Sequence, residues 1–333
     1  MLTVISDIHI GAIRSGGTTP ASQWALRKNI LSKFKDLLPP EGDLLINGDL
    51  FDSANIPISD VLATYEILSD WLQAHPTSRL YNSAGNHDLP KTSTTLSSFQ
   101  FLGKLLSRSC PNYRHIEQPT MTPYGYVIPH LVNQEVFNEA LENTPPCDFV
   151  FLHANYDNFF AQQSDQSLNV SKEQAQALPC KNVIFGHEHH GRRLGKVLIP
   201  GNQVASSVAD WISEGDKYHI VIRDDLVTFN LTAARNDEYI ELDWRNLTDT
   251  EHKFIRVAGK ASQEEAHEVV NALAAYRRKS EAFVITNAVQ IESADGLSTD
   301  FEATLEAAKG FDVIKCLLET LDAEERTVVE SLL

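Results

Sequence analysis

The feature that most constrains this chain is a set of five short apolar runs, each followed directly by residues that can bind a metal ion. The runs are rich in valine, isoleucine, leucine and phenylalanine, which is typical of buried strands. The polar residues that follow them are Asp7 and His9, Asp49, Asn86 and His87, His153, and His187 and His189. Ligands of α/β proteins collect in the loops at the carboxyl ends of strands. We therefore expect a strand-rich α/β unit with a polar site at those ends.

The residue types at these positions favour a catalytic metal site. They are imidazoles, carboxylates and one amide oxygen, without thiolates, a set that suits manganese, iron or zinc. Two carboxylates do not neutralise two divalent ions, so the site would stay cationic and could hold a phosphate. Asp49 is suited to bridge two ions because a carboxylate has two oxygens to share. Histidines such as His187 and His189 are often surface residues, but the other four strand ends supply partners for them.

The composition is that of a globular protein with more than one folding unit. The 333 residues are 42% hydrophobic and 22% charged, which is ordinary for a soluble protein, and they exceed one typical core. No apolar run approaches the roughly 18 residues of a membrane span. The start, MLTVISDIHI, lacks a basic segment, so no signal peptide is expected. The cysteines are scattered, which predicts free thiols in a reducing cytosol.

The charge balance bears on the kind of partner. The formal net charge is −17 at pH 7, whereas a protein that grips DNA by itself normally shows a basic face. Residues 291–333 carry eleven acidic and three basic side chains, a net charge of −8, which is nearly half of the imbalance. A nucleic-acid function would therefore rely on metal ions, a local basic patch or a partner protein.

Hydrophobic patterning predicts three parts along the chain. These are a catalytic α/β unit at 1–232, a small β-α-β unit at 233–292, and a polar linker with two amphipathic helices at 293–333. Within them we expect helices at 22–38 and 57–75, a long polar loop at 155–170, and a helix that starts at Ser262 with a capping box.

The five motifs DIH, GDLFD, GNHD, a histidine at a strand end, and GHEH, in this order over residues 7–189, resemble the calcineurin-like metallophosphoesterases. The resemblance implies a sandwich of mixed sheets flanked by helices, with two divalent metal ions. Its ligands would be Asp7, His9 and His189 for one ion, Asn86, His153 and His187 for the other, and Asp49 as the bridge.

The resemblance also implies roles for three residues around the ions. His87 would be the general acid at the leaving oxygen, and Asp52 would orient His87. His190 would be a spectator or a phosphate contact. We expect the remaining histidines to be ordinary core or surface residues: His75, His115, His130, His219, His252 and His267.

Within this superfamily, the stretch GDLFDSANIP, with Pro57 opening a helix, resembles the SbcD/Mre-type nucleases of double-strand-break repair. The β-α-β unit resembles the DNA-capping domain of that family. The last 23 residues resemble its C-terminal helices, which hold the coiled coil of an SbcC/Rad-type ATPase. The compact appendages are similar to those of phage versions of the subunit.

The SbcD resemblance implies a DNA exonuclease and endonuclease that uses Mn²⁺. It also implies a homodimer of the nuclease subunit within a heterotetramer, in the cytoplasm of a bacterial or phage-infected cell. Two other classes stay open. A small-molecule or cyclic-nucleotide phosphodiesterase would have a closed pocket and act without DNA, and a non-catalytic scaffold on the same fold would lack some of the ligands.

Overall fold

The computed structural model describes residues 1–13, 19–90, 95–158, 167–205, 217–224, 226–231, 239–292 and 298–299. Contacts divide the chain into two compact units, with the change between Asp237 and Glu238. The predicted boundary after residue 232 falls among residues that the structure leaves undescribed. So do residues 301–333, which include both predicted C-terminal helices.

The first unit contains two six-stranded mixed sheets. The first sheet has the order β14-β13-β1-β2-β3-β4, with β1 to β4 parallel to one another. Its strands are β1 (Leu2–Ile5), β2 (Asp43–Asn47), β3 (Leu80–Ser83), β4 (Tyr113–Ile116), β13 (Tyr218–Arg223) and β14 (Leu226–Leu231). The second has the order β11-β12-β10-β7-β6-β5. Its strands are β5 (Thr120–Thr122), β6 (Gly125–Ile128), β7 (Cys147–His153), β10 (Cys180–Gly186), β11 (Arg192–Leu194) and β12 (Val197–Ile199).

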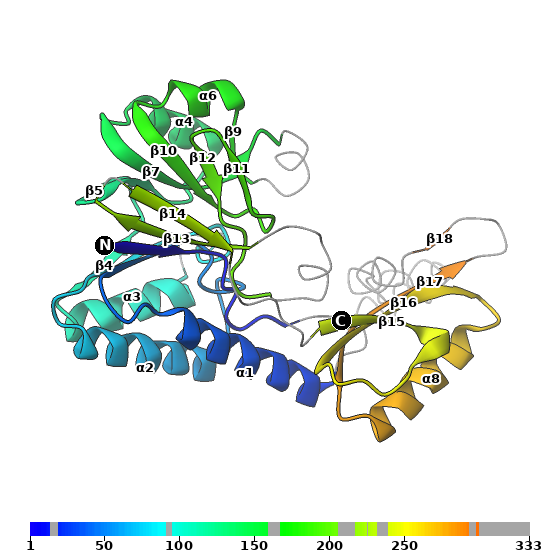
Figure 1. Cartoon of the computed structure of the whole chain (residues 1–333). Coiled ribbons are helices and arrows are strands. Elements are labelled where there is room, and N and C mark those ends of the chain that lie inside the picture. Colours follow the sequence, from blue (N-terminus) through cyan, green and yellow to red (C-terminus); the bar gives the residue numbers. More distant parts are fainter. Residues whose placement is uncertain are drawn as a thin grey trace, which may run out of the picture. The chain divides into compact units, whose positions relative to one another are not determined.

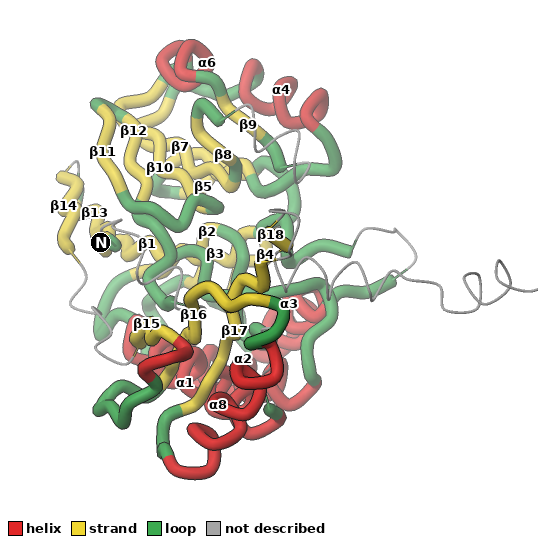
Figure 2. Tube along the Cα trace, turned by 90° about the vertical axis from the view of Figure 1, so that its right-hand side faces the viewer, coloured by secondary structure: helices red, strands yellow, loops and turns green. Residues whose placement is uncertain are grey.

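The two sheets pack face to face, with helices on both outer sides (Figures 1 and 2). Apolar side chains of both sheets form one core, which includes Val4, Leu45, Phe151, Ile184 and Ile220. The helices α1 (Pro20–Leu37), α2 (Ile58–Ala74) and α3 (Ser98–Ser109) cover the outer face of the first sheet. The helices α4 (Gln134–Glu142) and α6 (Lys172–Ala177) pack on the second. This is the sandwich of mixed sheets flanked by helices that was predicted.

Local signals set several element boundaries. Pro57 precedes the first residue of α2 and Ser171 precedes α6, where Ser171 and Gln174 form a reciprocal capping box. Trp24 has the helical spacing of Ile30 and Phe34, which are buried, but Trp24 itself is 59% exposed. The predicted loop at 155–170 contains a short parallel pair, β8 (Asn155–Tyr156) with β9 (Asn169–Val170). Residues 159–166 between them lie outside the described part.

The second unit, described from Tyr239, is a small sheet with one helix. Strands β15 (Tyr239–Asp243), β16 (Phe254–Ser262) and β17 (Phe283–Glu292) are parallel, and β18 (Ser298–Thr299) pairs antiparallel with β17. A 3₁₀ turn, η1 (Trp244–Asn246), follows β15, and α8 (Ala266–Lys279) packs on a separate core that includes Val257 and Leu273.

The helix of the second unit begins later than predicted. Ser262 and Glu265 exchange the two hydrogen bonds of a capping box, but β16 extends to Ser262 and the helix starts at Ala266. The box therefore closes a turn between strand and helix. In the part of the chain that the structure describes, no helix is both long and apolar enough to span a membrane.

Candidate metal centre

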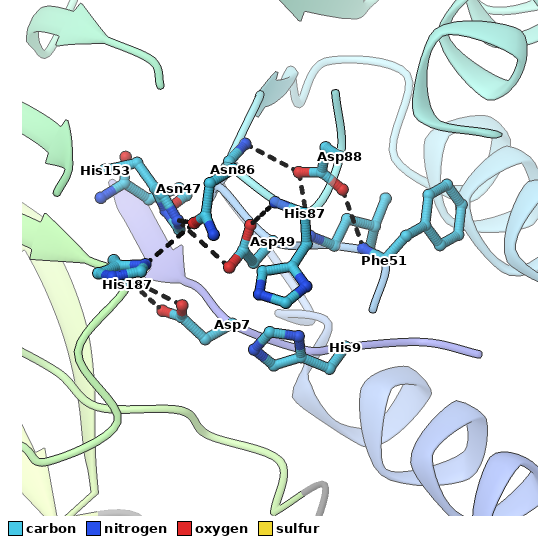
Figure 3. A network of polar contacts seen from close by, with 12 residues as sticks. Asp7, His9, Asn47, Asp49, Phe51, Asn86, His87, Asp88, His153 and His187 are labelled. Carbon is cyan, nitrogen blue, oxygen red and sulfur yellow. Dashed lines mark hydrogen bonds and ion pairs between the residues drawn. The ribbon is translucent and has the colours of Figure 1, made fainter. Parts of the chain in front are cut away.

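The strand ends of both sheets meet at one place in the first unit. In the first sheet, Asp7 and His9 follow β1, Asp49 follows β2, and Asn86 and His87 follow β3. In the second sheet, His153 ends β7, and His187 and His189 follow β10. Figure 3 shows most of these side chains pointing toward one another across the edge between the sheets. All seven predicted metal ligands and His87 thus lie in one cluster.

The ligand atoms form three overlapping groups in which all atoms lie within 4.8 Å of one another: Asp7, His9 and His189; His9, Asp49 and His87; and Asp49, His153 and His187. Asn86 joins the last group, because its Oδ1 lies 2.9 Å from His187 Nδ1 and 3.1 Å from His153 Nε2. Asp49 belongs to two of these groups. It lies between the ligands predicted for one ion and the ligands predicted for the other.

The donor set fits a cation because electron-rich atoms face one another. His153 Nδ1 lies 2.9 Å from the carbonyl oxygen of Asn47, so Nδ1 carries the proton when the ring is neutral, as it is when Nε2 binds a metal ion. Its Nε2 then presents a lone pair to Asn86 Oδ1 and, at 3.3 Å, to Asp49 Oδ2. Both are acceptors, and His153 is fully buried. Such an arrangement needs a positive charge between the atoms, which a divalent ion would supply.

Without an ion, a second proton on the His153 ring supplies this positive charge. Burial by itself lowers the pKa of His153, but the carboxylates of Asp49 and Asp7 overcome this effect and raise the pKa to about 9. Burial would raise the pKa of Asp49, but His153, His9 and His87 hold it well below its usual range. The carboxylate of Asp49 therefore stays ionised, and the cluster attracts positive charge.

The backbone of the centre is held in a strained form. Four of the six non-glycine residues with positive φ in the described chain are predicted ligands: Asp7 (55°), His9 (54°), Asp49 (50°) and His187 (90°). The left-handed conformation costs roughly 1 to 2 kcal/mol per residue. Main-chain bonds between the first two loops hold it in place, including Asp7 N to Gly48 O (3.1 Å) and Ile8 N to Asp49 O (2.9 Å). Strain that is held so firmly is typical of functional sites.

Comparison with known proteins agrees with this geometry. The family model of the calcineurin-like phosphoesterases matches residues 1–191. The chain belongs to this family. It is a metal-dependent phosphoesterase, and its ligand groups fit divalent ions. A solved structure of a protein of unknown function from Aquifex aeolicus is 16% identical, over 63% of this chain and 91% of that one, with a TM-score of 0.28. This value is too low to support a conclusion. No curated protein matches.

Asp52 contacts His87 through its main chain in this phosphoesterase. His87 Nδ1 donates to the Asp52 carbonyl oxygen at 2.6 Å, whereas the Asp52 carboxylate lies 3.5 Å from His9 Nδ1. The resemblance implied that Asp52 orients His87, and in the structure the main chain of Asp52 makes this contact.

Asp88, the last residue of GNHD, was not among the predicted site residues. Its buried carboxylate accepts hydrogen bonds from the backbone N–H groups of Gly85 (2.9 Å), Phe51 (3.0 Å) and Leu50 (3.3 Å), as Figure 3 shows in part. Burial, and then the charge of Asp49, raise the pKa of Asp88 to about 7. Asp88 ties the loop that carries Asp49 to the loop that carries Asn86 and His87. Its place next to the motif residues was the available sequence signal.

Two other histidines differ in their contacts with the centre. His190 is exposed, and only its carbonyl oxygen has a described contact, to Arg192. His130, which was expected to be an ordinary histidine, follows the end of β6 and its N–H bonds to Ala84 O. Burial lowers its pKa to about 4, and His153, Asp49 and His87 also act on it. His130 therefore belongs to the surroundings of the metal centre, where its imidazole is neutral.

Gly85 makes the close approach of two ligand loops possible, and we predict that Gly85→Ala disrupts the centre. A Cβ at this position would lie 2.1 Å from Asp49 Oδ1 and 2.3 Å from Asp49 N. The Asp49 loop would have to move, and overpacking of this kind costs about 1 to 3 kcal/mol. We expect reduced binding of Mn²⁺ in a calorimetric titration and a lower melting temperature.

Gly195→Ala is the matched control for this prediction. Gly195 has a φ of +63°, but a Cβ there meets nothing within 4 Å. The Gly195→Ala substitution should cost roughly 1 to 2 kcal/mol in backbone strain. It should not reduce the binding of Mn²⁺. A Gly85→Ala protein that binds Mn²⁺ as the wild type does would show that the loop spacing is not critical.

Proposed function

We propose that this phosphoesterase is the nuclease subunit of an SbcCD-like complex of DNA recombination and repair, with exonuclease and endonuclease activity. The observation that carries the proposal is the second compact unit, which follows the complete ligand set and has its own core of α8 against β16 and β17. Hydrolysis of a small phosphate ester does not need such an appendage. In the proposed function this unit, within predicted residues 233–292, caps the DNA.

The residues of the centre suit cleavage of a diester. Two bound divalent ions, proposed to be Mn²⁺, would supply an activated water and charge stabilisation for the phosphoryl oxygens. His87 is partly exposed, unlike the buried His153 and Asp49. With His87 Nδ1 committed to the Asp52 carbonyl oxygen, the ring holds its transferable proton at Nε2. That atom would protonate the leaving oxygen.

A side-by-side digestion assay tests the nuclease proposal. The wild-type chain with Mn²⁺ is given linear duplex DNA, single-stranded DNA, bis-p-nitrophenyl phosphate and a cyclic nucleotide. We expect metal-dependent cleavage of DNA and of the small diester. Turnover of the cyclic nucleotide without cleavage of either DNA would favour the alternative, a small-molecule or cyclic-nucleotide phosphodiesterase.

The net charge of −17 leads to a prediction for DNA binding. We expect the isolated chain to bind duplex DNA weakly, with micromolar or higher dissociation constants at near-physiological salt, because few phosphate charges would be neutralised. Fluorescence anisotropy with a labelled duplex, repeated over a series of salt concentrations, measures this. Nanomolar binding by the chain alone would contradict the prediction and indicate a local basic surface.

The C-terminal residues are proposed to bind the ATPase partner of an SbcC/Rad type. Ile314, Leu317, Leu318 and Leu321 have the i, i+3, i+4, i+7 spacing of one helix face, and an apolar helix face can dock in a groove of a partner. Such a complex would contain two copies of this chain and act in the cytoplasm. Residues 301–333 lie outside the described part, so the proposal rests on the sequence pattern.

Deletion of residues 301–333 should abolish co-purification with the ATPase and leave Mn²⁺-dependent cleavage of bis-p-nitrophenyl phosphate unchanged. Burial of each leucine or valine contributes about 1.5 to 3 kcal/mol, so the loss of several removes most of the affinity. Capture of the ATPase at full strength by the truncated chain would place the contact elsewhere. Loss of diesterase activity would mean that the helices belong to the enzyme's own core.

A further inference from the structure

The connection between β12 and β13 contains three polar side chains that are almost completely buried. Asn202, Gln203 and Lys217 are 0%, 3% and 9% exposed. A lysine is rarely buried to this extent unless its charge is paired or well hydrogen-bonded. None of the three belongs to the motifs that carry the metal ligands.

Lys217 binds the loop that carries His189. Its ammonium group donates hydrogen bonds to the carbonyl oxygen of His189 and to Asn202 Oδ1. The backbone beside Asn202 also touches this loop, because a Cβ at Gly201 would lie 2.7 Å from His189 O and 2.9 Å from Gly191 N. With a φ of +74°, Gly201 allows this approach. The position of His189 therefore depends on Lys217 and on the segment around Gly201.

Gln203 binds the loop that carries Asp7. Its Oε1 accepts a hydrogen bond from the N–H of Ser6 at 2.8 Å. Its Nε2 donates to the carbonyl oxygens of Gly201 (2.9 Å) and Tyr218 (3.0 Å). One side chain thus joins the residue before Asp7 to the segments that hold Lys217.

We propose that Lys217, Asn202 and Gln203 act together as a clasp that positions the metal group of Asp7, His9 and His189. The proposal rests on the two-ion centre of the proposed function. The other group has further supports of its own, since His153 is held by the carbonyl oxygen of Asn47 and the loop of Asn86 is held by Asp88. His187 of that group shares the loop of His189 and donates its N–H to Asp7 Oδ1 at 3.0 Å. The clasp therefore acts chiefly on the ion of Asp7, His9 and His189, and Lys217 is a positioning residue.

Replacement of the charged group tests the clasp. In Lys217→Met the stem remains but the donors to His189 O and Asn202 Oδ1 are lost. Loss of such outer contacts typically costs about 10- to 100-fold in metal affinity. A calorimetric titration with Mn²⁺ alone should show two ions in the wild type. The variant should bind one ion about 10- to 100-fold more weakly and the other with a clearly smaller loss.

Lys181→Met is the matched control. Lys181 lies at the start of β10, far along the strand from His187, and forms an exposed ion pair with Asp148. It should bind both ions as the wild type does. Should Lys217→Met fail to fold by circular dichroism, Lys217→Gln, which keeps a donor but no charge, replaces it and should show the same unequal loss to a smaller degree.

A double variant identifies which ion is affected. In a His189→Ala background the group of Asp7, His9 and His189 is already broken, so adding Lys217→Met should change the remaining binding isotherm by less than about twofold. Wild-type affinity for both ions in Lys217→Met, or equal weakening of both, overturns the clasp. A wild-type chain that binds fewer than two ions overturns the two-ion centre instead.

Discussion

Asp49→Ala is expected to abolish phosphoesterase activity and to weaken the binding of both ions. Asp49 has ligand atoms in two of the three groups, and its Oδ1 also accepts the backbone N–H of His87 at 3.0 Å. Its removal leaves His153 without its nearest carboxylate. Breaking a buried charge pair of this kind costs about 3 to 5 kcal/mol, and the activity should fall to background.

The expected result is measured as Mn²⁺ stoichiometry and as the rate on bis-p-nitrophenyl phosphate. Asp148→Ala is the control, because Asp148 is an exposed aspartate at the start of β7, on the strand that ends with His153. This control should keep two ions and full activity. An Asp49→Ala protein that still holds two ions at wild-type affinity would exclude Asp49 as the bridge.

His87→Ser is expected to keep both ions and to lose most of the activity on DNA. The His87 ring is fixed by the Asp52 carbonyl oxygen, and its predicted task is to protonate the leaving oxygen. Removal of one general acid is typically worth about 10² to 10⁴ in rate. The loss should be larger for DNA, whose leaving alkoxide needs a proton, than for bis-p-nitrophenyl phosphate, whose leaving phenolate is stable without one.

The two substrates therefore separate proton donation from metal binding. His75→Ser is the control, since His75 bonds to the carbonyl oxygens of Trp71 and Pro40 at the end of α2. Equal losses on both substrates would argue against proton donation by His87. Loss of one bound ion in His87→Ser would show that His87 is a metal ligand. The structure allows this outcome, because His87 forms a possible ligand group with His9 and Asp49.

Local patterns predicted the local features of the fold. Apolar runs that end on polar residues predicted β1, β2, β3, β7 and β10, and Pro57 lies at the predicted start of α2. The same kind of signal misplaced the helix after Ser262, because a capping box can also close a turn that precedes a helix. Trp24 has the spacing of a buried residue, but whether a position of α1 is covered depends on neighbours far away in the chain.

The sequence by itself determined the α/β class, the chemical types of the ligands and the strand ends that carry them, because strand periodicity and ligand chemistry are properties of short segments. Only the tertiary structure showed that ends of two different sheets meet and that Asp52 reaches His87 through its main chain. It alone showed Asp88, Gln203 and Lys217 supporting the ligand loops. These contacts join segments far apart in the chain, and most involve backbone N–H or C=O groups. Every residue type except proline has both groups, so the sequence does not show which backbone groups these side chains will contact.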